Sequence, residues 1–219
     1  MNKIEAINNR HSVRQYLVKP IDDEMIKELK KKIDLCNQES GLHIQLVLNE
    51  PKAFDCFMAH YGKFSGVKNY IALIGKKGKL LDELCGYYGE RIVIKATQLG
   101  LNTCWVAMSY KKIPSAFVID KGEKLVVVIA LGYGKTNGVM HKSKTIDQVS
   151  NASEETPDWF NQGVELALLA PTAMNQQKFK IIYDQNTVTF KSGIGFYSKV
   201  DLGIIKYHFE VGSSKRIYK

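Results

Sequence analysis

Apolar side chains recur at two different spacings along the chain. In several segments an apolar residue returns every three or four positions, as in Leu29, Ile33 and Cys36, which is the spacing of one helix face. This pattern predicts helices over residues 4–8, 22–36, 81–99, 157–170 and 200–211. Gly100 and Gly212 follow two of these segments and are expected to end them.

Shorter apolar segments predict strands over residues 43–48, 70–74, 103–106, 125–131, 178–183 and 187–190. Residues 125–131 form an unbroken apolar run, so this strand is expected at the centre of a sheet with both faces covered. Asp184, Gln185 and Asn186 separate the last two strands, which predicts a hairpin.

The order helix, turn, strand and then a helix ending in glycine occurs twice. We therefore expect a single domain with a degenerate internal duplication. The first half-repeat would span residues 1–140 and the second, shorter one residues 156–219. Residues 141–155 are polar and poorly periodic, and they are interpreted as a linker.

The composition is that of an ordinary globular protein. Of 219 residues, 45% are hydrophobic and 24% are charged. The longest wholly apolar run is far shorter than the roughly 20 residues that span a bilayer. No signal peptide is recognised at the N-terminus, so a cytoplasmic location without membrane association is expected. The four cysteines lie far apart, which argues against both a disulfide framework and a metal site.

The net charge of +9 favours an anionic partner. The lysines are scattered, and no basic stripe interleaved with aromatic residues is present. A nucleic-acid-binding domain is therefore the less favoured alternative. A small molecule that carries a phosphate explains part of the charge equally well.

Three segments carry candidate chemistry. Residues 10–14 (RHSVR) place two guanidinium groups and a hydroxyl close together, and arginine suits bidentate phosphate contacts. Residues 170–177 (APTAMNQQ) follow a helix with small residues and then amides that both donate and accept hydrogen bonds. Residues 100–108 (GLNTCWVAM) lead from a helix end into a buried strand.

These motifs, together with the A-L-G-Y sequence that ends the central strand, resemble those of the nitroreductase-like flavin oxidoreductases. The resemblance covers nearly the whole chain and is closest to a compact branch of that family. It implies an α+β fold with a central, mostly antiparallel sheet flanked by helices. It also implies FMN as cofactor and NAD(P)H as co-substrate.

The resemblance assigns flavin contacts residue by residue. The phosphate and ribityl chain would be held by Arg10, Ser12 and Arg14 with His11 alongside, and by Lys142 or Lys144. Near the reactive nitrogen of the ring would lie Val106, Ala107 and Met108. The ring edges would meet Pro171, Thr172, Ala173 and Asn175. No acid or base residue is required; His208 is interpreted as a core or interface histidine and Cys104 as an inert thiol in a short apolar strand.

The A-P-[ST]-A-x-N motif occurs here in the second half-repeat, whereas in ordinary family members it closes the second helix. We interpret the chain as a fused, asymmetric dimer with one complete site, either a monomer or itself a homodimer. The expected activity is hydride transfer from NAD(P)H to a small oxidant, such as a nitroaromatic or quinone, by a ping-pong mechanism. A flavin-binding sensor or store without turnover is the alternative.

Overall fold

The structure is a computed structural model that describes residues 1–217. The chain divides into two compact units, and each is described by itself. The first, called the sheet unit, comprises residues 10–81 and 92–139. The second, called the hairpin unit, comprises residues 1–9, 82–91 and the chain from residue 140 onwards.

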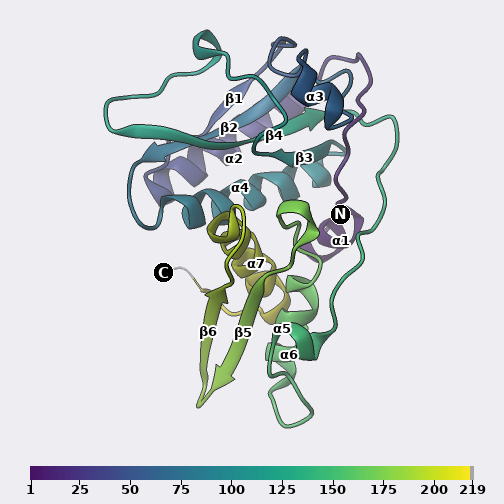
Figure 1. Cartoon of the computed structure of the whole chain (residues 1–219). Helices are drawn as coiled ribbons and strands as arrows, with labels where there is room; N and C mark the ends of the chain where they lie inside the picture. The colour runs from purple at the N-terminus through teal and green to yellow at the C-terminus, as the bar shows by residue number, and fades with distance from the viewer. Residues whose placement is uncertain (218–219) are drawn as a thin grey trace. The chain divides into compact units, whose positions relative to one another are not determined.

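The sheet unit is built on four antiparallel strands in the order β1-β2-β4-β3 (Figure 1). Its elements are α2 (Asp23–Ser40), β1 (Gln45–Val47), α3 (Phe57–Tyr61), β2 (Asn69–Lys76), β3 (Asn102–Val106), the 3-10 helix η1 (Pro114–Ala116), β4 (Glu123–Gly132) and the C-terminal part of α4 (Leu81–Gln98). The helices α2 and α4 were predicted from their apolar spacing, and this prediction is confirmed.

Strand β4 lies between β2 and β3, as its apolar run predicts. Its residues 127–132 are buried, because one face meets α2 and the end of α4 while the other meets a core cluster (Figure 1). Val128 and Ala130 belong to that cluster together with Tyr70 of β2 and Phe54 from the loop after β1. Burial on both faces explains why this strand shows no polar alternation.

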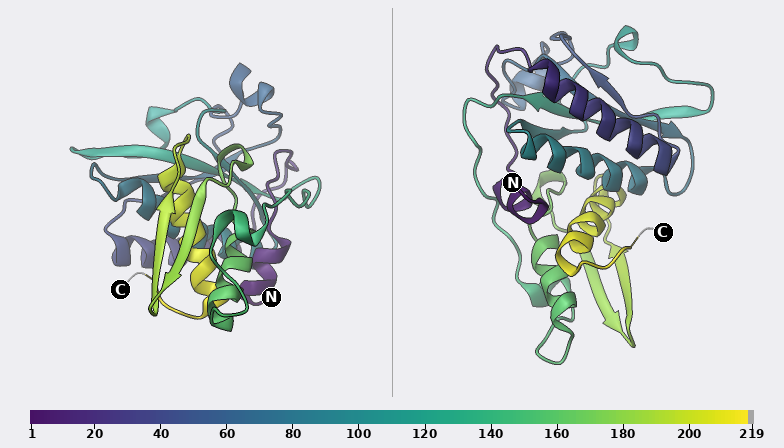
Figure 2. Two further views of the ribbon diagram at one scale, coloured as in Figure 1. Left: turned by 60° about the horizontal axis from the view of Figure 1, so that its bottom comes forward. Right: turned by 180° about the vertical axis from the view of Figure 1, so that it is seen from behind.

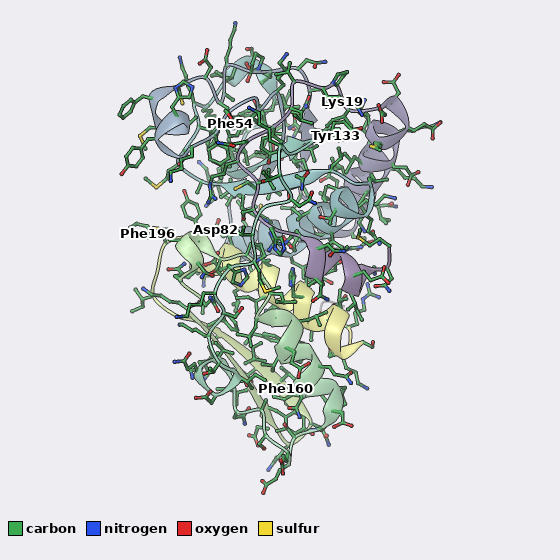
Figure 3. The ribbon with its side chains drawn as sticks, turned by 90° about the vertical axis from the view of Figure 1, so that its right-hand side faces the viewer. Lys19, Phe54, Asp82, Tyr133, Phe160 and Phe196 are labelled. Carbon is green, nitrogen blue, oxygen red and sulfur yellow. The ribbon has the colours of Figure 1, made fainter. Side chains whose placement is uncertain are left out.

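The hairpin unit contains the antiparallel strands β5 and β6, which lie beside helix α7 (Figure 2). Its elements are α1 (Lys3–Asn9), the N-terminal part of α4, α5 (Ile146–Val149), α6 (Asp158–Ala167), the 3-10 helix η2 (Ala173–Asn175), β5 (Phe179–Asp184), β6 (Thr187–Ser192) and α7 (Ser198–Ser213). The predicted hairpin is confirmed, and Gln185 and Asn186 turn it with positive φ angles of 43° and 66°. Phe160, labelled in Figure 3, packs with Phe209 at a ring-centroid distance of 5.7 Å in its core.

Two glycines allow helix α7 to approach the N-terminal part of α4 backbone to backbone. A Cβ atom at Gly203 would overlap the Glu83 carbonyl oxygen, and one at Gly86 would overlap the Val200 carbonyl oxygen. Across this crossing Tyr87 donates a hydrogen bond to the Glu210 carboxylate at 2.8 Å. The crossing fixes α7 within the hairpin unit.

One sequence-based expectation for this unit was wrong. Gly212 lies inside α7 and does not end it, because its missing side chain lets the helix approach the Gln162 carbonyl of α6. The segment interpreted as a linker stays a prediction; it contains the short helix α5, which a capping box of Thr145 and Gln148 stabilises. Four residues are too few to show a helical period.

The α+β class and the antiparallel sheet flanked by helices are confirmed. The hairpin unit has a two-stranded sheet where the sheet unit has four strands, and the internal duplication stays a prediction. Within residues 1–217 no helix is long and apolar enough to cross a membrane.

Candidate functional site

The R-x-S-x-R segment runs as extended chain beside strand β3 of the sheet unit. Ser12 forms a parallel bridge with Thr103, and the Val13 amide donates a hydrogen bond to the Thr103 carbonyl at 3.0 Å. Side chains of extended chain alternate between two faces. Val13 therefore enters the core, while Arg10, Ser12 and Arg14 fall on the same side of the segment.

These three polar side chains gather around Cys104. Burial raises the pKa of the Cys104 thiol, and the charge of Arg14, a hydrogen bond with Ser12 and the charge of Arg10 offset part of that increase. The net pKa lies above the ordinary value, so the thiol is protonated at neutral pH and is a poor nucleophile. These three interactions show that both guanidinium groups and the Ser12 hydroxyl lie near the same thiol.

The two arginines differ in accessibility. Arg10 is only 5% exposed, whereas Arg14 is exposed. His11 lies beside Gly138, where a Cβ atom would come within 2.8 Å of the His11 Cβ. Of the predicted phosphate ligands in the sheet unit, Arg14 is thus the one that a ligand reaches most easily.

A pocket of ≈ 420 Å³ opens beside Arg14. Its lining comprises Arg14, residues 61–64, residues 105–107 and Ser109, all from the sheet unit. Pockets for small molecules span about 300–1,000 Å³. Val106 and Ala107, expected beside the flavin ring, therefore share one pocket with Arg14. Met108 follows them, is 64% exposed and is not part of the lining.

The chemistry of this pocket fits a ligand that has both a phosphate and an aromatic ring. The Arg14 guanidinium lies 6.0 Å from the centre of the Phe64 ring, and Trp105 contributes a second aromatic wall. A cation next to flat apolar surface can bind an anionic group while the ring system stacks nearby. The donor set therefore suits a flavin mononucleotide. Phe64 and Gly62 were not singled out in the sequence, because aromatic and glycine residues in a loop carry no distinctive motif.

The second group of predicted site residues lies in the hairpin unit, in residues 170–177, which we call the proline–asparagine turn. Three residues of this turn have positive φ angles: Met174 (52°), Asn175 (53°) and Gln177 (44°). Such conformations are uncommon for residues with a Cβ atom. Pro171, Thr172 and Ala173 are partly exposed, and Met174 is 83% exposed.

The amide of Asn175 is already engaged inside the turn. Its Nδ2 donates to the Lys142 carbonyl at 2.9 Å, and its Oδ1 accepts from Gln177 Nε2 at 2.9 Å. Asn175 was expected to offer its amide to the flavin ring. In the structure this amide holds the turn with one donor and one acceptor, and Asn175 itself is exposed, so its contact with a flavin stays a prediction. Pro171, Thr172, Ala173 and Met174 form the exposed surface beside it.

The two candidate lysines differ in whether their side chains hold the turn. The Lys144 ammonium group donates to the Gln177 carbonyl at 2.9 Å, and the Lys144 amide donates to Gln177 Oε1 at 2.8 Å. The Lys142 residue is exposed and contributes only its carbonyl to the turn. Lys142 is therefore the lysine whose side chain is available for a phosphate.

Asp201 of α7 holds the proline–asparagine turn and was not singled out from the sequence. Its Oδ1 accepts from the Ala173 amide at 2.9 Å, and its Oδ2 accepts from Gln176 Nε2 at 2.8 Å. Burial raises the pKa of Asp201 to about 6, although these two hydrogen bonds act in the opposite direction. A signal was present in the sequence, since Asp201 is an acidic residue inside the apolar run 200–205.

Two other histidine clusters belong to the framework. His208 is fully buried; its ring donates to the Leu166 carbonyl at 3.1 Å, and its Nε2 lies 2.9 Å from Glu90 Oε1. His43 lies 2.9 Å from Glu123, with Asp120 nearby, and these three are the one group of possible metal ligands within residues 1–217. Glu123 also accepts a hydrogen bond from the Asp120 amide at 2.9 Å.

The predicted site residues thus form two groups, one within each unit. The sheet unit brings Arg14, Val106 and Ala107 into one pocket, and Arg10 and Ser12 join Arg14 around Cys104. The hairpin unit brings the proline–asparagine turn together with Lys142 and Lys144. That both groups contact one flavin stays a prediction.

Comparison with known proteins identifies the family. The family model described as "Putative TM nitroreductase" matches residues 2–213. Comparison with curated proteins finds no match. Among solved structures, a putative nitroreductase from Thermotoga maritima is similar, with 27% identity and a TM-score of 0.70 over 97% of this chain and 83% of that chain.

Two more distant structures share the fold. One is a putative nitroreductase in complex with FMN from Desulfovibrio desulfuricans, with 16% identity and a TM-score of 0.55 over 72% of this chain and 99% of that chain. The other is named a putative NADH dehydrogenase/NAD(P)H nitroreductase from Parabacteroides distasonis, with 19% identity and a TM-score of 0.53 over 68% and 97%. Since the family model covers nearly the whole chain, this protein belongs to the family described as Putative TM nitroreductase, and its α+β fold is that of the nitroreductases.

Proposed function

We propose that this protein is an FMN-dependent oxidoreductase that takes hydride from NAD(P)H and passes it to a small oxidant, such as a nitroaromatic or a quinone. The observation that supports this most strongly is the pocket that Arg14 shares with Val106 and Ala107. In this pocket the Arg14 guanidinium suits a phosphate. The end of strand β3 and the aromatic side chains suit a planar ring. A relative with the same fold is described in complex with FMN.

When bound, FMN would supply the hydride chemistry, because that chemistry belongs to the cofactor. The residues of this chain would bind and orient it. Arg14 would hold the phosphate, with Arg10 and Ser12 supporting it from behind. The backbone of residues 106–108 would lie along the ring, and the proline–asparagine turn would contact the ring edges. The positive charge of Arg14 and Lys142 would favour an anionic cofactor.

The test begins with the purified protein and added FMN. We expect tight binding of one FMN per chain, measured by quenching of flavin fluorescence, and oxidation of NADH or NADPH when a nitroaromatic or quinone acceptor is present. A bound ratio of two FMN per chain would contradict the prediction of a single site. Binding without turnover for a panel of acceptors would favour the alternative of a flavin sensor or store.

A further inference from the structure

The proline–asparagine turn has a conformation that its own backbone does not favour. Met174, Asn175 and Gln177 all have positive φ angles, although each carries a Cβ atom. Residues held in such conformations persist only where the surrounding contacts fix them, and they cluster at ligand-binding sites. The question is which contacts fix this turn.

Asp201 is the buried charged group among those contacts, whereas Lys144, which holds the Gln177 carbonyl, is exposed. Asp201 is 6% exposed, and its two carboxylate oxygens hold the Ala173 amide and the Gln176 side chain. The Gln176 Nε2 group also donates to the Phe196 carbonyl at 2.7 Å, which ties the chain after β6 to the same point. One carboxylate from α7 therefore fixes both ends of the η2 turn.

An ionised carboxylate is an expensive choice at a buried position, because the charge must leave water. Its advantage is that both oxygens accept hydrogen bonds at the same time, whereas an asparagine side chain has a single acceptor oxygen. The raised pKa of Asp201 reflects the cost of burial. The buried, ionised carboxylate thus destabilises the folded state, while its two hydrogen bonds fix the shape of the turn.

We propose that Asp201 is a positioning residue for the flavin, because it fixes the surface formed by Pro171, Thr172, Ala173 and Met174. It acts through Ala173 and Gln176 and does not itself touch the flavin. This inference rests on the proposed function, since it requires the proline–asparagine turn to contact the flavin. It adds a residue on α7 to the determinants of flavin affinity.

The test compares wild-type protein with Asp201→Asn, Asp201→Ala and the control Asp184→Asn. Asp184 is an exposed acidic residue of the same unit, so its substitution removes the same charge without touching the turn. Each protein is titrated with FMN, the visible circular dichroism of the bound flavin is recorded, and stability is measured by urea unfolding. The dichroism reports the surroundings of the ring, which a purely structural role of Asp201 would leave unchanged.

We expect Asp201→Ala to weaken FMN binding by about tenfold or more, the scale of lost hydrogen bonds to a charged group. Asp201→Asn keeps one acceptor, so it should lose about threefold, with altered dichroism and no loss of stability at neutral pH. Asp184→Asn should behave as wild type. The different responses of affinity and stability in Asp201→Asn are the decisive result.

Wild-type affinity and dichroism in Asp201→Asn would overturn this inference and leave the proposed function intact. A wild-type protein that binds no FMN would overturn the proposed function and this inference with it. Should Asp201→Ala fail to fold, Asp201→Asn still decides, because it preserves the volume of the side chain.

Discussion

The two regions that carry the predicted flavin contacts are held in place by different forces. In the sheet unit, Arg14 and Val106 are positioned by backbone pairing along β3, next to the buried strand β4. In the hairpin unit, the proline–asparagine turn is positioned by side-chain hydrogen bonds from Asp201, Asn175 and Lys144. Backbone pairing does not depend on any single side chain, whereas the turn is expected to lose its shape when one of its anchors is removed.

This difference has a consequence for function. A site built on backbone pairing should respond to substitution only through the side chain that touches the ligand. A site built on side-chain anchors should also respond to substitutions one step away from the ligand. The following predictions test this contrast in order of decreasing effect.

The largest effect is expected where α7, the helix that carries Asp201, crosses α4. Gly203→Val would place a side chain against the Glu83 carbonyl and the Tyr87 amide, both of which are backbone groups. Overpacking of this kind costs about 3 kcal/mol. Urea unfolding should show this loss, while Lys199→Ala, an exposed substitution on the same helix, should show almost none.

The two tryptophans allow the affected region to be identified. Trp159 lies in the hairpin unit and Trp105 in the sheet unit. With Trp105→Phe as background, the fluorescence of Trp159 should report the destabilisation by Gly203→Val. With Trp159→Phe as background, Trp105 should report a smaller effect or a later transition. Equal shifts for both probes would show that the two regions unfold as one.

The second effect is a pH dependence that Asp201 imposes on stability. Burial raises the pKa of Asp201 to about 6 in the folded protein, above the ordinary aspartate value of 3.8. The folded state therefore binds the proton more tightly, and this contribution to stability is fully present below about pH 4 and is lost as pH rises through 6. The shift corresponds to a loss of up to about 3 kcal/mol.

Asp201→Asn removes this titration. The stability of the variant relative to wild type, from urea unfolding, should therefore improve between pH 4 and pH 7. A difference that is independent of pH over this range would show that Asp201 has an ordinary pKa and that its burial carries no cost.

Much of the fold follows from sequence, for physical reasons that differ between elements. Helix α2 and strand β4 were predicted because a long amphipathic face and an unbroken apolar run leave few alternatives. Helix α3 was missed, because it has five residues and its Phe57 and Tyr61 are 80% and 78% exposed. Gly212 was interpreted as a helix end because the sequence does not distinguish a glycine that ends a helix from one that allows close packing of two helices.

The candidate site follows the same division. The R-x-S-x-R spacing is that of one strand face, so the grouping of Arg10, Ser12 and Arg14 could be anticipated. The burial of Arg10 could not, because it depends on tertiary contacts. Asn175 is expected to contact the ligand, and the structure adds that its amide also holds the turn. An amide side chain can bind a ligand or hold a turn together, and the sequence alone does not show which hydrogen-bond partners it has.

In the sheet unit, Arg14→Ala should weaken FMN binding by roughly 1–3 kcal/mol, the range for a lost hydrogen bond to a charged group. Stability should change little, because Arg14 is exposed. Arg14→Lys should restore only part of the affinity, since lysine lacks the planar fork of arginine. Lys121→Ala, which removes one exposed charge elsewhere in the sheet unit, is the control, and unchanged FMN affinity in Arg14→Ala would remove Arg14 from the phosphate site.

The smallest effect distinguishes the two lysines of the hairpin unit. Lys142 has an available side chain, so Lys142→Ala should weaken FMN binding by at most about 1 kcal/mol, the scale of an exposed ion pair. Riboflavin, which lacks the phosphate, should bind the Lys142→Ala variant as well as it binds wild type. Lys144 instead holds the Gln177 carbonyl, so Lys144→Ala should weaken the binding of FMN and the binding of riboflavin by the same factor. If Lys144→Ala weakened the binding of FMN but not of riboflavin, the Lys144 ammonium group of the wild-type protein would have to contact the phosphate. The turn would then not depend on Lys144 as an anchor.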